Sequence, residues 1–494
     1  MLSRPLRPAL VLAALLAAAA ARADTALTLD EAVHLALERN QSIKVEAYGR
    51  PIARANLLTE LGRFDPAVTF RRSYTENGAP YSSDVDTGLV TQLVKTDAYS
   101  LAFEGTTPWG LNYSLGGSAD HTRVRSSLAA LNEDAGYATF GGVTITQPLL
   151  RGFGFGANLA GYRVAKADRG IADWQFRQTV IDTVTNVIGA YSDLVYAQQS
   201  LRIAERSRGL AAGLLEENEK RFKVGSMSEA DVAQARARTA TRDENILVAA
   251  QGVSDATNRL RQLIGETTFP ITPEGYALQA PEVPPTVVDP ATDLQTALNQ
   301  RPDYQAARLG LAKRRANDAA ARNQLLPQVD FVGSYGYNGL DRDFSSSRRM
   351  VRNYDNRSYS AGMVVSVPLT FAEGRGKSRA ARLQLRQGEA DLVRLEQDIA
   401  VAVAHAAGQI ETTRKRVAAN RAAYDLAKQA LEAEIKKLRA GTSSTFFVLN
   451  LQEELTYADL NFQAALADQR RAHAAYEQAL GRTLATYRIP LTKE

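Results

Sequence analysis

The chain has 494 residues, 59 Lys and Arg against 54 Asp and Glu, and no cysteine. The lack of cysteine excludes disulfides, thiolate metal sites and a lipidated N-terminal cysteine. Three arginines lie in the first 23 residues, so the formal charge of +5 falls to +2 without that segment and gives no argument for a nucleic-acid partner.

Residues 1–23 predict a secretory signal peptide. Arg4 and Arg7 supply the positive end, an apolar run follows, and Ala21-Arg22-Ala23 matches a cleavage site. The apolar run is about 13 residues long, whereas a membrane-spanning helix needs about 20. We therefore expect an exported chain that begins at Asp24, with no transmembrane helix in its mature part.

Residues 24–265 predict a first repeat that mixes helices and strands. An opening helical region ends before Pro66, and alternating apolar and polar residues then predict strands at about 66–80, 86–118 and 138–148. A long helix to about 224 and a returning helix over 228–264 follow. Within 86–118 a turn at Thr107–Gly110 predicts a hairpin, which either widens a barrel or folds over it as a flap.

Residues 266–292 are rich in proline and predict an irregular linker. Residues 293–481 then predict a second repeat: a helix, strands at about 328–338 and 358–368, a long helix to about 439 and a return helix over 444–480. Residues 482–494 remain as a tail. Glycines 216 positions apart, Gly225 with Gly441 and Gly265 with Gly481, support a tandem duplication.

Apolar residues at intervals of seven predict that both long helices pack along a narrow seam. The series are Val403, Ile410, Val417, Tyr424, Leu431 and Leu438, and, in the first repeat, Val187, Leu194, Leu201, Arg208, Leu215 and Phe222. Only Arg208 breaks the apolar character. The predicted fold class is mainly α, with duplicated long helical hairpins and strands suited to an antiparallel β-barrel wall. Because a few strands per chain cannot close a barrel, oligomerisation is required.

Several short motifs carry a family resemblance. They are Leu27–Ala32, Thr146–Gly152, Arg221–Gly225, Arg301–Asp303 and Leu438–Gly441. In their order and doubling they resemble the TolC-type outer-membrane efflux proteins, the channels of tripartite efflux and type I secretion systems. The resemblance implies a homotrimer whose outer-membrane barrel continues as a periplasmic helical tunnel. With four strands from each protomer the barrel has twelve strands, and with the extra hairpin it has eighteen.

The resemblance also implies the function and the partners. We expect a passive export channel in contact with outer-membrane lipid, a periplasmic adaptor (membrane fusion) protein, and an inner-membrane pump of the RND, ABC or MFS type. No cofactor is implied. Which substrate is exported does not follow from the residues.

The turns between the long helices are candidate adaptor-docking tips. They comprise Val224, Gly225 and Ser226 in the first repeat and Ala440, Gly441 and Thr442 in the second. Glycine at a helix C-terminus followed by a serine N-cap is also what any helical hairpin uses, so the motif has a purely structural explanation too.

Residues just beyond these turns correspond to the periplasmic entrance of the family. Asp231 keeps the family aspartate, whereas Phe447 and Asn450 stand where well-known members carry acids and Ser443 where they carry a basic residue. A ring of Phe447 side chains, with Phe446 nearby, could gate by excluding water. The alternative is that both phenylalanines pack between helices.

Other readings of the sequence are weaker. A periplasmic helical scaffold without a pore would use the strand pairs as soluble hairpins, and a periplasmic hydrolase would need a catalytic cluster. The four histidines are scattered, and no metal-ligand or nucleophile motif is present. The segment from Asp341 to Arg357 contains five arginines, either as a solvated loop or as a contact for lipopolysaccharide phosphates.

Overall fold

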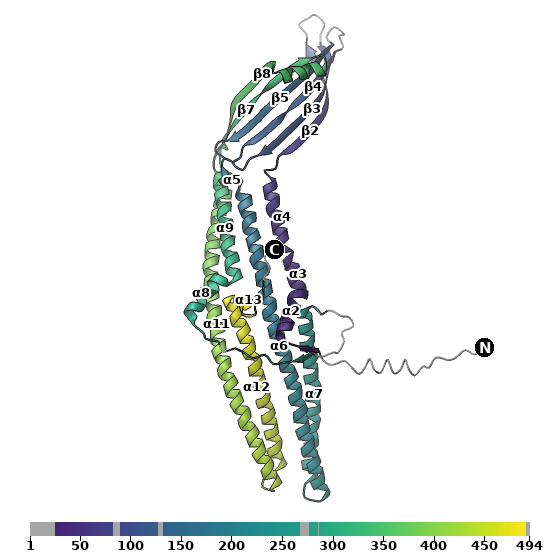
Figure 1. Cartoon of the computed structure of the whole chain (residues 1–494), viewed down its shortest axis with the longest axis vertical. Coiled ribbons are helices and arrows are strands. Elements are labelled where there is room, and N and C mark those ends of the chain that lie inside the picture. The colour runs from purple at the N-terminus through teal and green to yellow at the C-terminus, as the bar shows by residue number, and fades with distance from the viewer. Residues whose placement is uncertain (1–24, 83–88, 127–131, 267–275, 285, 491–494) are drawn as a thin grey trace, which may run out of the picture. The chain divides into compact units, whose positions relative to one another are not determined.

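The computed structural model describes residues 25–82, 89–126, 132–266, 276–284 and 286–490 (Figure 1). The predicted signal peptide lies outside these ranges, as do parts of the linker and of the tail. The chain divides into two compact units. One comprises residues up to 49, 173–306 and from 393 onward, and the other comprises 50–172 and 307–392. Among the described residues, no helix combines the length and apolar character needed to cross a membrane.

Four long helices form two hairpins. The first pairs α6 (Ala160–Lys223) with α7 (Glu229–Ile264), and the second pairs α11 (Ala372–Arg439) with α12 (Thr445–Leu480). With 64 residues, α6 rises about 96 Å at 1.5 Å per residue. Helices α6 and α11 contribute to both units. The C-terminal ends of α6 and α11 and both ends of α7 and α12 lie within a residue or two of the positions that the sequence predicts.

Shorter elements surround the hairpins. They are β1 (Thr25–Leu27), α2 (Leu29–Arg39), α3 (Gln41–Ala47), α4 (Gly49–Gly62), α5 (Phe155–Asn158), β6 (Tyr276–Leu278), α8 (Pro290–Gln300), α9 (Pro302–Asn323) and α13 (Thr483–Thr486). The linker is not wholly irregular, because β6 pairs in parallel with β1. The Tyr191 hydroxyl contacts the carbonyl oxygens of Leu27 and Gln279, at 2.8 and 3.0 Å, and so fixes both segments to α6.

The first unit contains three hydrophobic clusters. The largest gathers one face of α6 with α2 and the end of α7, and includes the fully buried Val184, Leu194 and Leu260. The second centres on Ile399, Tyr476 and Leu480. The third, near the turns, packs residues of α6, α11 and α12 together: Leu214, Leu431, Leu438, Val448 and Leu449.

The seven-residue seam is confirmed in α11 and wrong in the lower half of α6. Val403, Leu431 and Leu438 are buried as predicted. In α6, however, Arg208 is exposed and pairs with Asp243 at 3.0 Å, and Phe222 is 45% exposed. The buried row instead runs through Ser207, Ala211, Leu214 and Asn218. It is displaced by one position because α6 packs here against α11 and α12: Leu214 lies with Leu431 and Val448, and the Ser207 hydroxyl contacts that of Thr456 at 3.1 Å.

The second unit contains a six-stranded antiparallel sheet. Its strands are β2 (Ala67–Ser82), β3 (Leu89–Thr106), β4 (Asn112–Ser126), β5 (Glu133–Pro148), β7 (Gln328–Asp341) and β8 (Asn356–Ser366), in the order β2-β3-β4-β5-β7-β8. The pairing of β5 with β7 joins the two repeats across the sheet.

The extra hairpin belongs to the sheet and is not a flap. Strands β3 and β4 pair with each other and bridge β2 to β5. Their turn requires Gly110, whose φ is +100° and whose added Cβ would lie 2.4 Å from the Gly152 carbonyl oxygen. Strand β4 extends beyond 118 and β5 begins before 138, because polar residues such as Asp120 and Arg123 conceal the alternation there.

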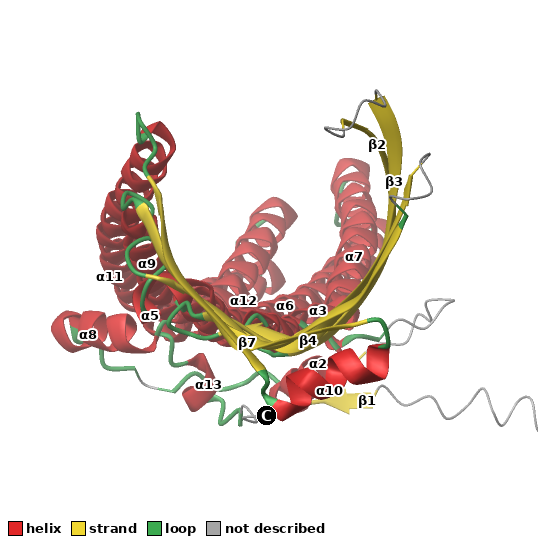
Figure 2. Cartoon of the chain, turned by 90° about the horizontal axis from the view of Figure 1, so that it is seen from above, coloured by secondary structure: helices red, strands yellow, loops and turns green. Residues whose placement is uncertain are grey.

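A ten-residue helix, α10 (Phe344–Asn353), replaces part of the arginine-rich loop expected between β7 and β8. Asp343 caps its N-terminus, accepting from the Ser346 N–H at 3.0 Å. The helix packs on β5 and β7. Seen from above, it lies on the convex face of the curved sheet (Figure 2).

Candidate channel surfaces and entrance

The two faces of the sheet differ sharply in chemistry. Residues paired across neighbouring strands share a face, so the register places Val68, Phe103, Leu115, Tyr335 and Tyr359 on one side. This face is apolar and much of it is exposed: Val68 and Tyr359 are each 71% exposed. It is also the face that carries α10 and is therefore convex (Figure 2).

The concave face is polar and lined by small side chains. A shallow hollow on it is formed by Thr69, Arg71, Ser100, Glu104, Ser114, Gly116, Ser118 and Thr144 with their neighbours. Thr69 donates a hydrogen bond to the Glu104 carboxylate. One apolar face for hydrocarbon and one polar face for water is the arrangement of an outer-membrane barrel wall.

Both predicted tips have the same backbone geometry. Gly225 and Gly441 each adopt a φ of +77°. After them, the N–H groups of Ser226 and Thr442 donate to carbonyl oxygens five residues earlier, at 2.9 and 3.0 Å. A Cβ added at either glycine would meet nothing within 4 Å, so glycine is needed for its dihedral angle and not for space. Val224 is 78% exposed, and Ala440 is exposed as well.

The predicted entrance residues begin the return helices. Asp231 accepts from the Ser228 hydroxyl at 2.6 Å and belongs to the N-cap of α7. Ser443 donates to the Glu434 carboxylate. Phe446 and Phe447 are 48% and 57% exposed and meet edge to face, with ring centroids 5.8 Å apart. Asn450 is exposed on the same helix. Within one chain, therefore, the two phenylalanines are not packed between helices.

Polar contacts between the two hairpins were not predicted from the sequence. Arg238 of α7 pairs with Glu453 of α12 at 3.0 Å. Farther from the turns, Arg206 of α6 pairs with Asp459 at 3.3 Å, and the hydroxyls of Ser207 and Thr456 lie 3.1 Å apart. Burial raises the pKa of Asp459 above its usual value, and the nearby Arg206 opposes the shift. These contacts hold the second hairpin to the first.

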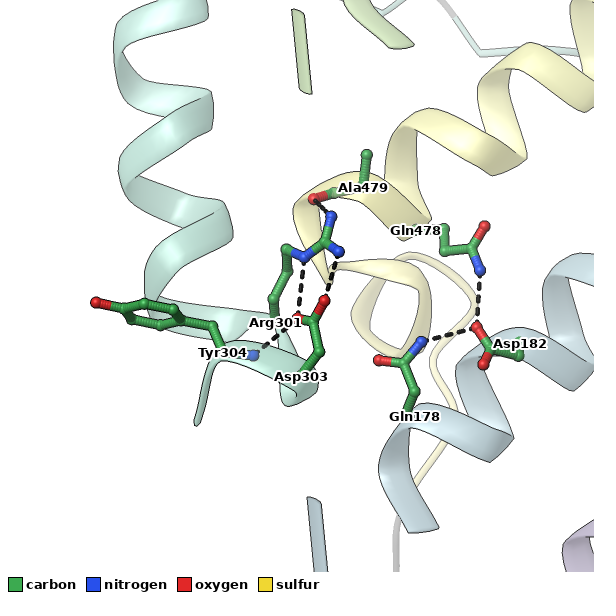
Figure 3. A network of polar contacts seen from close by, with 7 residues as sticks. All are labelled: Gln178, Asp182, Arg301, Asp303, Tyr304, Gln478 and Ala479. Carbon is green, nitrogen blue, oxygen red and sulfur yellow. Dashed lines mark hydrogen bonds and ion pairs between the residues drawn. The ribbon is translucent and has the colours of Figure 1, made fainter. Parts of the chain in front are cut away.

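The Arg301-Pro302-Asp303 motif has a structural role at the start of α9 (Figure 3). The Arg301 guanidinium donates to both carboxylate oxygens of Asp303, at 3.1 and 2.6 Å, and to the carbonyl oxygen of Ala479 at 3.3 Å. A carboxylate on α6, Asp182, accepts from Gln178 and from Gln478 of α12, each at 2.8 Å. Both contacts tie the end of α12 to neighbouring segments.

A chain that combines two pairs of long helices with a sheet that has one apolar and one polar face has the features of one class of protein, the outer-membrane export channels. Comparison with known proteins agrees with this class. The family model for outer membrane efflux proteins matches residues 110–266 and 294–482, which is well over half of the chain. The chain belongs to the outer membrane efflux protein family.

Individual relatives share the fold at low sequence identity. The chain is 26% identical to the outer membrane efflux protein BepC of Brucella suis over 353 residues, covering 71% of this chain and 74% of BepC. It is 22% identical to the alkaline protease secretion protein AprF of Pseudomonas aeruginosa, covering 71% of each. The CmeC outer membrane channel of Campylobacter jejuni superposes with a TM-score of 0.69 at 16% identity, covering 92% of this chain and 86% of CmeC.

The family confirms the predicted fold class, a helical tunnel combined with a barrel, and the predicted function. The chain is an outer-membrane channel that extends into the periplasm and exports substrates as part of an efflux or secretion assembly. The alternative of a scaffold without a pore is set aside. Members of this family are channels and not enzymes.

Proposed function

We propose that three copies of the chain share one barrel and one tunnel. The support is the pair of free edges. Among the residues that the structure describes, β2 and β8 end the six-stranded sheet, and each leaves a row of backbone donors and acceptors without a neighbouring strand. Such edges in a membrane require pairing, because no water is present to satisfy them. Pairing β8 of one protomer with β2 of the next closes the sheet without any further element.

A trimer of six-stranded protomers has an eighteen-stranded barrel. With strands about 4.8 Å apart and tilted by about 40°, the backbone radius is about 18 Å, compared with about 12 Å for twelve strands. The small and polar side chains of the concave face leave much of this width open. The proposed barrel is therefore a wide, water-filled outlet.

The proposed channel is passive, and the chain catalyses no reaction of its own. Energy comes from an inner-membrane pump, through an adaptor that contacts the tips. The exposure of Val224 and Ala440 and the matching geometry of the two turns support this docking. In a trimer the two kinds of turn alternate around the ring, so an adaptor meets six nearly equivalent turns.

The proposed entrance closes by excluding water and not by charge. Phe446 and Phe447 present exposed aromatic rings just beyond the turn, and Asn450 and Ser443 are neutral. Apolar constrictions of this kind block ions by dewetting. Because Ser443, Phe447 and Asn450 are neutral, Asp231 is the one acid among the proposed entrance residues, and strong selection of cations is not expected. Protein cargo, as AprF's name indicates for that relative, and small efflux substrates are both compatible with this chain.

The proposal rests on the sheet, which has one apolar and one polar face and two edge strands, β2 and β8, without partners in the described part of the chain. The test is to purify the mature chain in detergent, determine its subunit number by mass, and record single-channel currents in planar bilayers. We expect trimers that form stepwise conductances. Trimers without conductance would contradict the pore, and a monomer that stays in solution without detergent would contradict the whole arrangement.

A further inference from the structure

Helix α10 is seated tightly on the convex face of the sheet. The hydroxyls of Ser347 and Thr139 lie 2.7 Å apart in a buried contact, and the Phe344 ring meets the Tyr137 ring at 5.6 Å. Two glycines allow the close approach. A Cβ at Gly339 would lie 2.0 Å from the Ser347 carbonyl oxygen, and one at Gly141 would lie 2.7 Å from Val351. The helix is therefore a fixed part of the wall.

Aromatic side chains mark the level at which α10 lies. The hydroxyls of Tyr335 and Tyr337 are 3.1 Å apart, and the Tyr337 ring lies 4.8 Å from that of Tyr354, the C-cap residue just after α10. Tyr359 is 71% exposed on the next strand. Tyrosines gathered at one level of the lipid-facing surface are typical of the membrane–water interface. A helix at this level is expected to lie beside the lipid headgroups.

The side of α10 turned away from the sheet carries three arginines. Arg348, Arg349 and Arg352 lie within about 100° of one another around the helix axis, and all three are exposed. In the part of the chain that the structure describes, the ion pairs of the second unit are made by other residues, such as Arg72 with Asp97. Arg357, by contrast, lies over the Tyr359 ring at 5.8 Å.

We propose that α10 is a binding site for the phosphate groups of the anionic glycolipid in the outer leaflet. An amphipathic helix held flat at the interface, with arginines on its free side, matches the geometry by which such helices engage anionic headgroups. The planar guanidinium suits phosphate because it donates two parallel hydrogen bonds. With three copies of α10, the trimer holds a shell of this lipid around its outer end.

A solvated loop would not need this construction. A merely exposed connection requires neither the two strand glycines nor the buried contact between Ser347 and Thr139. The close packing of α10 on the lipid-facing side of the sheet is therefore the observation that favours a lipid partner over bulk water.

The test compares two triple variants of the full-length trimer. One is R348Q/R349Q/R352Q in α10. The matched control, R375Q/R379Q/R382Q, removes the same number of exposed arginines from α11. Binding of purified lipid A is measured in detergent by native mass spectrometry or labelled-lipid titration. Dephosphorylated lipid A and inorganic phosphate serve as competitors.

We expect the α10 variant to lose about tenfold to 100-fold in affinity for lipid A, while the α11 control stays within about twofold of the parent. A third variant with lysine at the three α10 positions keeps the positive charge but lacks the planar guanidinium group. It should bind lipid A with an intermediate affinity. Equal losses in the α10 and α11 variants would overturn the proposal. So would full competition by dephosphorylated lipid A, or by inorganic phosphate at the same concentration as the lipid.

Discussion

The ion pair between Arg238 and Glu453 is expected to oppose opening of the entrance. It joins α7 of the first hairpin to α12 of the second at 3.0 Å, about 20 Å along the helix from the tip at 1.5 Å per residue. If the second hairpin moves outward to widen the entrance, this contact must break. Glu453→Gln removes the charge and keeps the shape of the side chain.

The magnitude follows from the exposure of the pair. At 3 Å and an effective dielectric constant of about 20, Coulomb's law gives about 5.5 kcal/mol. The side chains are 38% and 29% exposed, however, so solvent screening reduces the net value to about 1 kcal/mol. If the three protomers open together, the total is about 3 kcal/mol, which is a change of about 100-fold in the ratio of open to closed channels.

The assay is the open probability of single channels in planar bilayers. The matched control is Glu216→Gln, which removes a carboxylate that pairs with Lys220 within α6 at 2.7 Å and joins no two helices. We expect Glu453→Gln to raise the open probability strongly, Glu216→Gln to leave it unchanged, and the exchange Arg238→Glu with Glu453→Arg to restore the closed state. Equal behaviour of Glu453→Gln and Glu216→Gln would refute the reasoning.

Three further outcomes are expected. Phe447→Ala should raise single-channel conductance, because it removes an exposed aromatic ring from the proposed constriction; an unchanged conductance would discard the aromatic gate. Val224→Asp combined with Ala440→Asp should abolish export while leaving the trimer intact, since a docked tip would bury an unpaired charge; continued export would remove the docking assignment. Burial lowers the pKa of His473 below its usual value, so the folded chain favours the neutral imidazole. The contribution of His473 to the free energy of unfolding is therefore complete above the unfolded pKa of about 6.5 and decreases as the pH falls from there toward the pKa in the folded chain. His473→Gln should therefore lose less thermal stability than the parent between about pH 7.5 and 5.5, and an identical loss in both would contradict the assignment.

The features that the sequence predicts well are local. The helix ends at Gly225 and Gly441 depend on a positive φ, and the start of α7 depends on the side chain of Ser228, so the requirements are visible in a few letters. Ser444, at the corresponding position before α12, makes no such side-chain hydrogen bond. The capping box of Thr28 with Glu31 is local in the same way. The strands were also recognisable wherever apolar and polar residues alternate.

The features that the sequence does not predict depend on partners far along the chain. Arg238 and Glu453 are 215 positions apart, and neither is distinguishable from other charges on a solvated helix until the hairpins pack. The same holds for α10: Gly339 looks like a weak strand residue until the Ser347 carbonyl oxygen is found to occupy the space above it. The inclusion of β3 and β4 in the sheet likewise required the full strand order.

The most direct test of the trimeric channel is a chemical cross-link between β8 of one protomer and β2 of the next. The chain has no native cysteine, so single cysteines placed on β2 (Ser73 or Thr75) and on β8 (Ser358 or Ser360) are the only thiols available to a short bifunctional maleimide. In outer-membrane vesicles, the account predicts that a β2–β8 pair gives covalent dimers and trimers and nothing larger. Monomers alone across all pairs, or a ladder that continues beyond three chains, would contradict it.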